Sequence, residues 1–400
     1  MHTIPIRPVQ AAPSGSLEIA LDAPPPLALY VHFPWCVRKC PYCDFNSHAV
    51  RDEIPQAAYV DALLADLETA LPQIWGRRLQ TVFIGGGTPS LIEPPQLDRL
   101  LEGVRALGNL VPGAEITLEA NPGTVDTSRM RDFRAAGVTR LSLGVQSFDD
   151  RLLARIGRIH GGRDARLAVD AALSHFDRVN IDLMYALPGQ SMTELDQDLD
   201  VLTESGVEHL SCYHLTIEPN TAFHASPPPI PDEDLASDMQ DRVEERLAAA
   251  GYGHYETSAF ARPGGRCQHN LNYWRFGDYL GIGAGAHGKL SGHTGIVREM
   301  RHRHPGAYLD GAQRRDFVQD TRQVAAADLP FEFMMNALRL IDGFEPGLFA
   351  ATTGLPWTRV EPLLVEARRE GFLAFDGACV RPTERGRHFL NDLLQRFLPD

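Results

Sequence analysis

The chain has 400 residues, of which 44% are hydrophobic, and its formal net charge is −14. A chain of this length buries a large core and has room for two or three domains. The acidic balance argues against nucleic-acid binding, which needs a basic face for the phosphates. No segment reaches the about 18 consecutive apolar residues of a membrane span. We therefore expect a cytoplasmic protein that does not span the membrane.

Residues 1–26 are rich in proline and lack the apolar core and cleavage pattern of a signal peptide, which predicts a disordered leader. Residues 27–220 alternate short β-branched runs with helical patterns, which predicts parallel βαβ units of right-handed connection. Six such units are too few for a closed eight-stranded barrel, so we expect an α/β fold with a partial (βα)6 TIM-like barrel. The predicted strands are Leu27–Phe33, Thr81–Ile84, Glu115–Glu119, Leu141–Val145, Val179–Met184 and Leu210–Leu215.

Polar or reactive residues follow each predicted strand, and in such barrels the chemistry lies at the carboxyl ends of the strands. Three cysteines follow the first strand and a glycine triplet follows the second. We expect these groups to converge on one mouth of the barrel. In chain order they are Cys36, Cys40, Cys43, Gly85-Gly86-Gly87, Glu119, Asn121, Gln146, Asp182 and His214.

Residues 221–324 begin with a proline-rich stretch and are interpreted as a barrel extension or linker. Residues 325–400 form a separate predicted domain, with amphipathic helices at Phe331–Arg339 and Val360–Glu370 and a hairpin at Gly371–Val380. This pattern is winged-helix-like. The domain has eight arginines and no lysine against eleven acidic residues, a net charge of −3. We therefore expect a docking module or a lid over the barrel mouth instead of a DNA-binding domain.

The spacing Cys36-x3-Cys40-x2-Cys43 is the strongest chemical signal. Thiolates are the standard ligands of iron–sulfur clusters, and three on one loop can hold three irons of a [4Fe–4S] cluster. A structural zinc site normally has four ligands in two separated pairs, and the other cysteines are isolated. Zinc binding and three ordinary buried thiols remain the alternatives.

With Pro41 and Tyr42 between its last two cysteines, this loop resembles the signature of the radical S-adenosylmethionine (SAM) family. The resemblance implies that three cysteines bind the cluster and that SAM chelates the fourth iron. It also implies that Tyr42 contacts the adenine, and that the glycine-rich strand end binds the methionine moiety through Gly86, Gly87 and Thr88. Glycines allow such close approach of bare backbone to a ligand.

Further segments resemble the coproporphyrinogen dehydrogenase branch of this family, among them Tyr30–Cys36 and Glu119–Pro122. That likeness implies a SAM site surrounded by Tyr30, Glu119, Gln146, Arg158 and Asp182, where Arg158 can pair with the methionine carboxylate. One position departs from the pattern. Phe45 stands where that branch has a further cysteine, which puts coproporphyrinogen chemistry in doubt.

The segment His269-Asn270-Leu271-Asn272-Tyr273-Trp274 resembles the HNxxYW motif of a heme chaperone branch. The resemblance implies heme contacts by His269, Asn270, Tyr273 and Trp274. Imidazole is a common axial ligand of heme, and aromatic rings can cover the macrocycle. From the residues alone, the favoured alternative is a surface histidine or a histidine satisfied within the core, with Tyr273 and Trp274 as packing aromatics. Other candidate ligands or heme contacts are His214, Cys267, His287 and the basic stretch Arg301–His304.

We therefore expect a heme carrier that binds a [4Fe–4S] cluster, SAM and heme, receives electrons from a donor, and delivers heme to acceptor proteins. Respiratory enzymes at the inner face of the membrane are the expected acceptors, so peripheral association with that face is a further hypothesis. The alternative is an oxygen-independent coproporphyrinogen III dehydrogenase-like enzyme that acts on a tetrapyrrole. A winged-helix regulator is a third alternative, which the acidic charge disfavours.

Overall fold

The computed structural model describes residues 19–376 and 379–399. One curved sheet dominates it, with the strand order β14-β13-β12-β11-β1-β4-β5-β6-β7-β8-β10-β9. Its centre contains six parallel strands in chain order, as the sequence predicts, and each predicted strand overlaps one of them. They are β1 (Leu27–Phe33), β4 (Leu79–Gly86), β5 (Leu110–Ala120), β6 (Arg140–Gln146), β7 (Arg178–Tyr185) and β8 (His209–His214).

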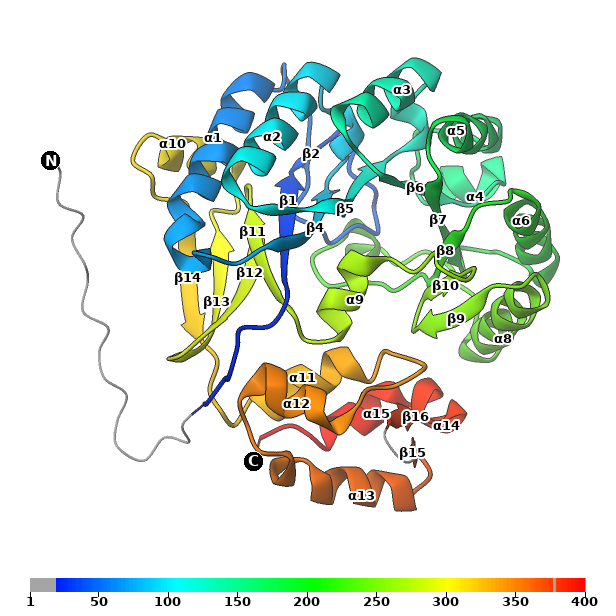
Figure 1. Cartoon of the computed structure of the whole chain (residues 1–400). Helices are drawn as coiled ribbons and strands as arrows, with labels where there is room; N and C mark the ends of the chain where they lie inside the picture. The colour runs from blue at the N-terminus through cyan, green and yellow to red at the C-terminus, as the bar shows by residue number, and fades with distance from the viewer. Residues whose placement is uncertain (1–18, 377–378, 400) are drawn as a thin grey trace, which may run out of the picture.

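Helices cover the outer face of this sheet (Figure 1). Because one face packs on helices and the other lines the barrel interior, the strands are apolar along most of their length. Local signals set the helix starts. The Asp126 carboxylate accepts a hydrogen bond from the backbone of Arg129, and Ser191 and Glu194 form a capping box. The helices are α1 (Gln56–Ala70), α2 (Pro94–Leu107), α3 (Thr127–Ala136), α4 (Asp150–Arg155), α5 (Gly162–His175), α6 (Met192–Glu204), α7 (Ala222–Ala225) and α8 (Glu233–Ala249).

The segment predicted as an extension contributes strands to both edges of the sheet. On one side β11 (Asp278–Ile282) pairs in parallel with β1, so the parallel part has a seventh strand. Antiparallel strands β12 (His287–Gly292), β13 (Gly295–Arg301) and β14 (Val318–Gln323) continue that edge. On the other side β10 (Ala259–Ala261) and β9 (Gly253–Glu256) follow β8. Helix α9 (Gln268–Trp274) connects the two edges and packs on β4, β1 and β11, whereas α10 (Pro305–Ala312) contacts α1.

The C-terminal part is a second packing unit below the barrel (Figure 1). It contains α11 (Leu329–Ala337), α12 (Pro346–Thr353), α13 (Glu361–Arg369), α14 (Glu384–His388), α15 (Leu390–Gln395) and the hairpin of β15 (Leu373–Phe375) and β16 (Val380–Pro382). Its core includes Phe276 and Ile296 from the barrel extension, and the rings of Phe276 and Phe333 lie 5.7 Å apart. This shared core holds the unit against the barrel.

Of the predicted leader, residues 1–18 lie outside the described residues. The remainder, 19–26, is irregular in backbone, and the Ala20 amide donates to the Gly354 carbonyl at 3.3 Å. Across the described ranges, none of the helices combines the length and the apolar character that a bilayer crossing would require.

Candidate functional site: two adjoining cavities of the barrel

The cysteine loop follows β1 and is closed by a short parallel pair, β2 (Trp35–Cys36) and β3 (His48–Ala49). The Val50 amide donates to the Cys36 carbonyl at 2.8 Å, and the Cys43 amide donates to the Cys40 carbonyl at 3.2 Å. Burial raises the pKa of the Cys36 and Cys43 thiols. These contacts hold three thiols on the wall of one cavity of about 430 Å³, which we call the cysteine cavity.

The positions of the three thiols around the cysteine cavity indicate whether they fit a single metal ion or an iron–sulfur cluster. Among the described residues, no three His, Cys, Asp or Glu side chains are grouped so that they could hold one metal ion. In a cubane cluster each cysteine binds its own iron, so its ligands surround a larger object than a single ion. Three thiols around one cavity therefore fit a cluster better than a tetrahedral zinc ion.

The residues that end the parallel strands meet in the cysteine cavity. Its walls include every SAM-site residue that the sequence suggests except Tyr30, together with Asn121 and His214. The suggested residues found there are Tyr42, Gly86, Gly87, Thr88, Glu119, Gln146, Arg158 and Asp182. At Gly87 a Cβ atom would lie 2.6 Å from the Trp35 carbonyl oxygen, so a side chain has no room there.

Two carboxyl groups give the cysteine cavity its electrostatic character. Burial, and then repulsion from Asp182, raise the pKa of Glu119 to about 8. Burial also raises the pKa of Asp182, whose carboxylate accepts from Asn180 at 2.8 Å. The Gly86 amide donates to Glu119 at 3.1 Å. Two desolvated carboxyls in one cavity favour a cationic ligand, and the amino and sulfonium groups of SAM are cations of this kind.

Arg158 and Gln146 also line the cysteine cavity. The Arg158 guanidinium lies 3.8 Å from Cys40 Sγ and donates to the Gly144 carbonyl, while its buried Nε has no partner in the described part of the chain. A carboxylate ligand would satisfy that donor. Gln146 has a φ of +74°, an uncommon conformation for a residue other than glycine, and it accepts from the Tyr213 hydroxyl at 2.8 Å.

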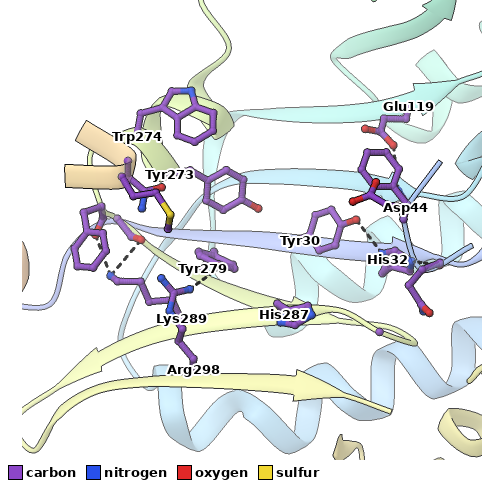
Figure 2. A pocket seen from close by; sticks show the side chains of 18 of the residues that line it. Tyr30, His32, Asp44, Glu119, Tyr273, Trp274, Tyr279, His287, Lys289 and Arg298 are labelled. Carbon is purple, nitrogen blue, oxygen red and sulfur yellow. Dashed lines mark hydrogen bonds between the residues drawn. The ribbon is translucent and has the colours of Figure 1, made fainter. Parts of the chain in front are cut away.

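A second cavity of about 520 Å³, which we call the aromatic cavity, adjoins the first. Asp44, Phe45, Gly86 and Glu119 line both. Figure 2 shows the side chains of the aromatic cavity, which come from β1, α9 and the β11–β13 edge, and also from the cysteine loop, β5 and α11. Its aromatic residues are Tyr30, Phe45, Tyr273, Trp274, Phe276 and Tyr279. Tyr273 and Tyr279 pack edge to face with ring centroids 4.7 Å apart.

The aromatic cavity also has a basic end, which Lys289 and Arg298 form (Figure 2), and Arg303 lines the cavity as well. Lys289 is 1% exposed and donates to Asp278 at 2.9 Å. Arg298 donates twice to Glu332 of α11, at 2.9 and 2.8 Å. Of this cavity, the expectations above name His287 and the stretch that contains Arg303 as candidates, but they include neither Lys289 and Arg298 nor the contribution from α11. The sequence signal that could have revealed this face of the cavity is the alternation of His287, Lys289 and Ser291 along one strand.

The motif residues His269 to Trp274 divide into two groups. His269 is fully buried, its Nδ1 lies 2.8 Å from Thr81 Oγ1, and its Nε2 lies 2.9 Å from the Tyr273 hydroxyl. Burial lowers the His269 pKa to about 3. Tyr273 and Trp274 line the aromatic cavity, whereas Asn270 is partly buried and lines neither cavity. The structure thus brings two of the four suggested heme contacts to one cavity.

A partial parallel barrel with a three-cysteine loop and a glycine-rich second strand defines the radical SAM class of protein. The Radical SAM superfamily profile matches residues 30–202, and the HemN C-terminal domain profile matches residues 324–389. Coproporphyrinogen III oxidase (HemN) from Escherichia coli, a radical SAM enzyme, has the same fold, with a TM-score of 0.79, 22% identity and coverage of 94% of this chain and 90% of that one.

Curated relatives define the family more narrowly. The heme chaperone HemW of Escherichia coli is 50% identical over 378 residues, which cover 94% of this chain and 99% of the relative. The heme chaperone HemW of Haemophilus influenzae is 44% identical with the same coverage. A mitochondrial radical S-adenosyl methionine domain-containing protein 1 from Bos taurus is 35% identical, over 93% of this chain and 87% of that protein. The chain belongs to the HemW family of the radical SAM superfamily.

Proposed function

We propose that this protein is a heme chaperone that binds a [4Fe–4S] cluster, SAM and heme, and that delivers the heme to acceptor proteins. The observation that carries the proposal is the aromatic cavity beside the cysteine cavity. A flat apolar macrocycle with two carboxylate arms suits a space with aromatic walls and a basic end. The names of the HemW relatives support the same function.

In this proposal Cys36, Cys40 and Cys43 bind the cluster, and family membership implies both the cluster and SAM. Gly86, Gly87 and Thr88 receive the methionine moiety of SAM, Tyr42 covers its adenine, and Arg158 pairs with its carboxylate. A reduced cluster supplies the electron that cleaves bound SAM in radical SAM chemistry.

The carboxyls of Glu119 and Asp182 then serve as the counter-charge for the sulfonium and amino groups. Because Glu119 has a pKa of about 8, it gives up a proton when a cation enters at neutral pH. The Tyr213 hydroxyl holds the Gln146 side chain, and Tyr30 lines the aromatic cavity. In this proposal Gln146 and Tyr30 set the orientation of SAM toward the aromatic cavity. We place SAM between these groups and the thiols.

Phe45 favours the carrier over a coproporphyrinogen dehydrogenase-like enzyme. It occupies the position at which the dehydrogenase pattern has a further cysteine, it is 59% exposed, and it lines both cavities. A phenyl ring at this place can cover part of a macrocycle, but it offers neither a thiolate nor a transferable hydrogen with the chemistry of a thiol.

The test uses the full chain, purified and reconstituted without oxygen. Titration with hemin, followed by the Soret band, is expected to give saturable binding of one heme per chain. A parallel assay with coproporphyrinogen, SAM and a reductant is expected to give no decarboxylation. Turnover of the tetrapyrrole would replace the carrier with the enzyme, and absence of heme binding would remove the chaperone proposal altogether. Transfer of bound heme to an apo-acceptor, such as a respiratory membrane enzyme depleted of heme, tests the delivery step.

A further inference from the structure

We propose that His287 supplies the axial imidazole to a heme held in the aromatic cavity, and that His269 is a positioning residue for Tyr273. This inference rests on the proposed heme binding and goes further by naming the cavity, the ligand and the role of the motif histidine. It differs from the expectation that His269 itself contacts the heme.

The position of His287 on the sheet directs it into the aromatic cavity. His287 begins β12, and Lys289 lies two residues further on, so both side chains are on one face of the strand. Lys289 pairs with Tyr279 of β11 and with Arg298 of β13, which places these two residues on the same face. Figure 2 shows His287 below Tyr30, with Lys289 and Arg298 on the side toward Trp274.

The histidines in and near the aromatic cavity differ in whether their ring nitrogens already make hydrogen bonds. The aromatic cavity has two histidines, His32 and His287. His32 uses both ring nitrogens, at 2.9 Å to the Tyr30 hydroxyl and at 2.8 Å to the Asn46 carbonyl. His269, outside the cavity, also uses both. His287 is exposed to the cavity, and within residues 19–376 and 379–399 its ring makes no hydrogen bond. A free imidazole nitrogen is what iron requires.

The charge around His287 suits both iron and the propionates of heme. Burial, followed by the nearby guanidinium groups of Arg298 and Arg303, lowers the pKa of His287, so the ring is neutral at pH 7. The neutral ring is the form that binds a metal. The Arg303 guanidinium, which makes no hydrogen bond or ion pair within residues 19–376 and 379–399, can pair with a carboxylate arm of a ligand that enters the cavity, whereas Arg298 already donates to Glu332. The imidazole for the iron and the guanidinium for the carboxylate arms thus come from one hairpin and the loop that follows it.

Close packing holds the hairpin that contains His287 against the cysteine loop. At Gly281 a Cβ atom would lie 2.0 Å from the His287 carbonyl oxygen, so a side chain there would displace β12. At Gly285, which has a φ of +82°, a Cβ atom would lie 2.1 Å from the Asn46 amide nitrogen. Asn46 in turn donates to the Ala284 and Arg303 carbonyls, each at 2.9 Å. The glycine-rich segment from Gly281 to Gly288 therefore holds His287 in register with the loop of thiols.

The role of His269 follows from the residue it contacts. Its Nε2 contacts the hydroxyl of Tyr273, one turn further along α9, and Phe83 of β4 packs on its ring with centroids 5.1 Å apart. The imidazole thereby orients the tyrosine that forms the cavity wall. The His269 ring has no solvent exposure, so to bind a heme iron it would have to give up one of its two hydroxyl partners, Thr81 or Tyr273.

The experiment compares His287→Ala, His269→Gln and the control His293→Ala, each in the full chain. His293 is an exposed histidine in the turn of the same hairpin, and it lines neither cavity. After titration with hemin, His287→Ala is expected to bind heme about tenfold more weakly or worse and to show a shifted Soret band and an altered ferric electron paramagnetic resonance (EPR) signal. His269→Gln and His293→Ala are expected to keep the EPR signal of the wild type, because the ligand remains.

A rescue experiment separates ligation from folding. In His287→Gly, added imidazole is expected to restore the wild-type Soret position and EPR signal, whereas it has no such effect in His293→Ala. Two results would overturn the inference and leave the chaperone proposal intact. One is a heme spectrum in His287→Ala that is unchanged from the wild type. The other is loss of bound heme in His269→Gln while that variant remains folded. A wild-type protein that binds no heme would overturn the chaperone proposal and this inference together.

Discussion

Glu119 lies between the cysteine and aromatic cavities and lines both. Burial and the neighbouring Asp182 raise its pKa from the ordinary 4.5 to about 8, so the carboxyl is protonated at pH 7 until a cation arrives. The folded protein then holds a proton that the unfolded chain releases, and stability depends on pH in a defined direction. The sequence located this residue at a strand end, but the pKa follows from packing that only the structure provides.

For the ligand-free protein, the Glu119 contribution to the free energy of unfolding is fully present below about pH 4.5 and is lost as the pH rises through about 8. We expect Glu119→Gln to remove this dependence and to be more stable than the wild type at about pH 8. Urea denaturation at about pH 6 and about pH 8 measures both effects. Glu102→Gln, on the exposed side of α2, is the control, and an equal pH dependence in Glu119→Gln and the wild type would contradict the assignment.

The three thiols give a second test at the scale of single residues. Cys36→Ala, Cys40→Ala and Cys43→Ala are each expected to lose the visible absorption of the reconstituted cluster, because each thiolate binds one iron. Cys212→Ala serves as control, since Cys212 is buried in the barrel core and outside the cysteine loop. Iron and sulfide analysis checks the outcome. Full iron and sulfide content in any of the first three variants would contradict the ligand assignment.

At the scale of elements, α9 shows why a motif read from sequence divides in the structure. His269 and Tyr273 lie one turn apart on the same face of α9, but Thr81 and Phe83 of β4 enclose the His269 ring, whereas Tyr273 and Trp274 reach the aromatic cavity. The resemblance pointed to this segment, and two of its residues line the aromatic cavity. It could not tell which of its residues face a ligand, because that depends on how α9 packs against β4, β1 and β11.

His269→Ala is therefore expected to act on stability. The change removes a buried ring and leaves the Thr81 hydroxyl without its partner, which costs about 2–4 kcal/mol of the free energy of unfolding. Because His269 has a pKa of about 3 in the folded protein against an ordinary 6.5, its own contribution is present above about pH 6.5 and is lost as the pH falls toward 3. Urea denaturation of His269→Ala and the control Asn270→Ala measures the difference. Equal midpoints would contradict the buried role.

The sequence predicts the six central strands and some of the helices because each of these has a strong local pattern: continuous β-branched runs, an N-cap such as Asp126, or an amphipathic face. The same local signals fail for β11–β14. Asp278 and Lys289 are buried charges that satisfy each other, so these strands lack the apolar alternation by which strands are found. The pairing of β11 with β1 joins residues about 250 positions apart, which no local pattern reports.

At the scale of the whole molecule, the ion-pair network at Glu332 joins the barrel edge to the C-terminal domain. Glu332 of α11 is 7% exposed and accepts from Arg298 of β13 and from Arg322 of β14, in each case at 2.8 Å in the shortest bond. The winged-helix-like hairpin of β15 and β16 occurs where the sequence predicts it. How this domain docks could not be predicted, because the contact depends on charged pairs between segments whose strand character was not recognised.

Glu332→Gln is expected to weaken this junction by about 1–3 kcal/mol, since two guanidinium groups lose their shared carboxylate. Amide hydrogen exchange of α11 should become faster, and release of heme from the loaded protein should accelerate. Glu361→Gln, at the exposed start of α13, is the control for a lost charge in the same domain. Unchanged exchange in α11 would show that the network does not hold the domain.

Met335 and Asn336 of α11 also line the aromatic cavity, while its other walls belong to the barrel and its edge strands. The cavity is therefore complete only while the two units are docked. A ligand held there touches both units, so its binding free energy opposes their separation, and separation in turn lowers its affinity by the same amount. An acceptor that draws α11 away from the barrel would thus obtain the cargo without competing for the iron directly, and an unloaded molecule would open more readily than a loaded one.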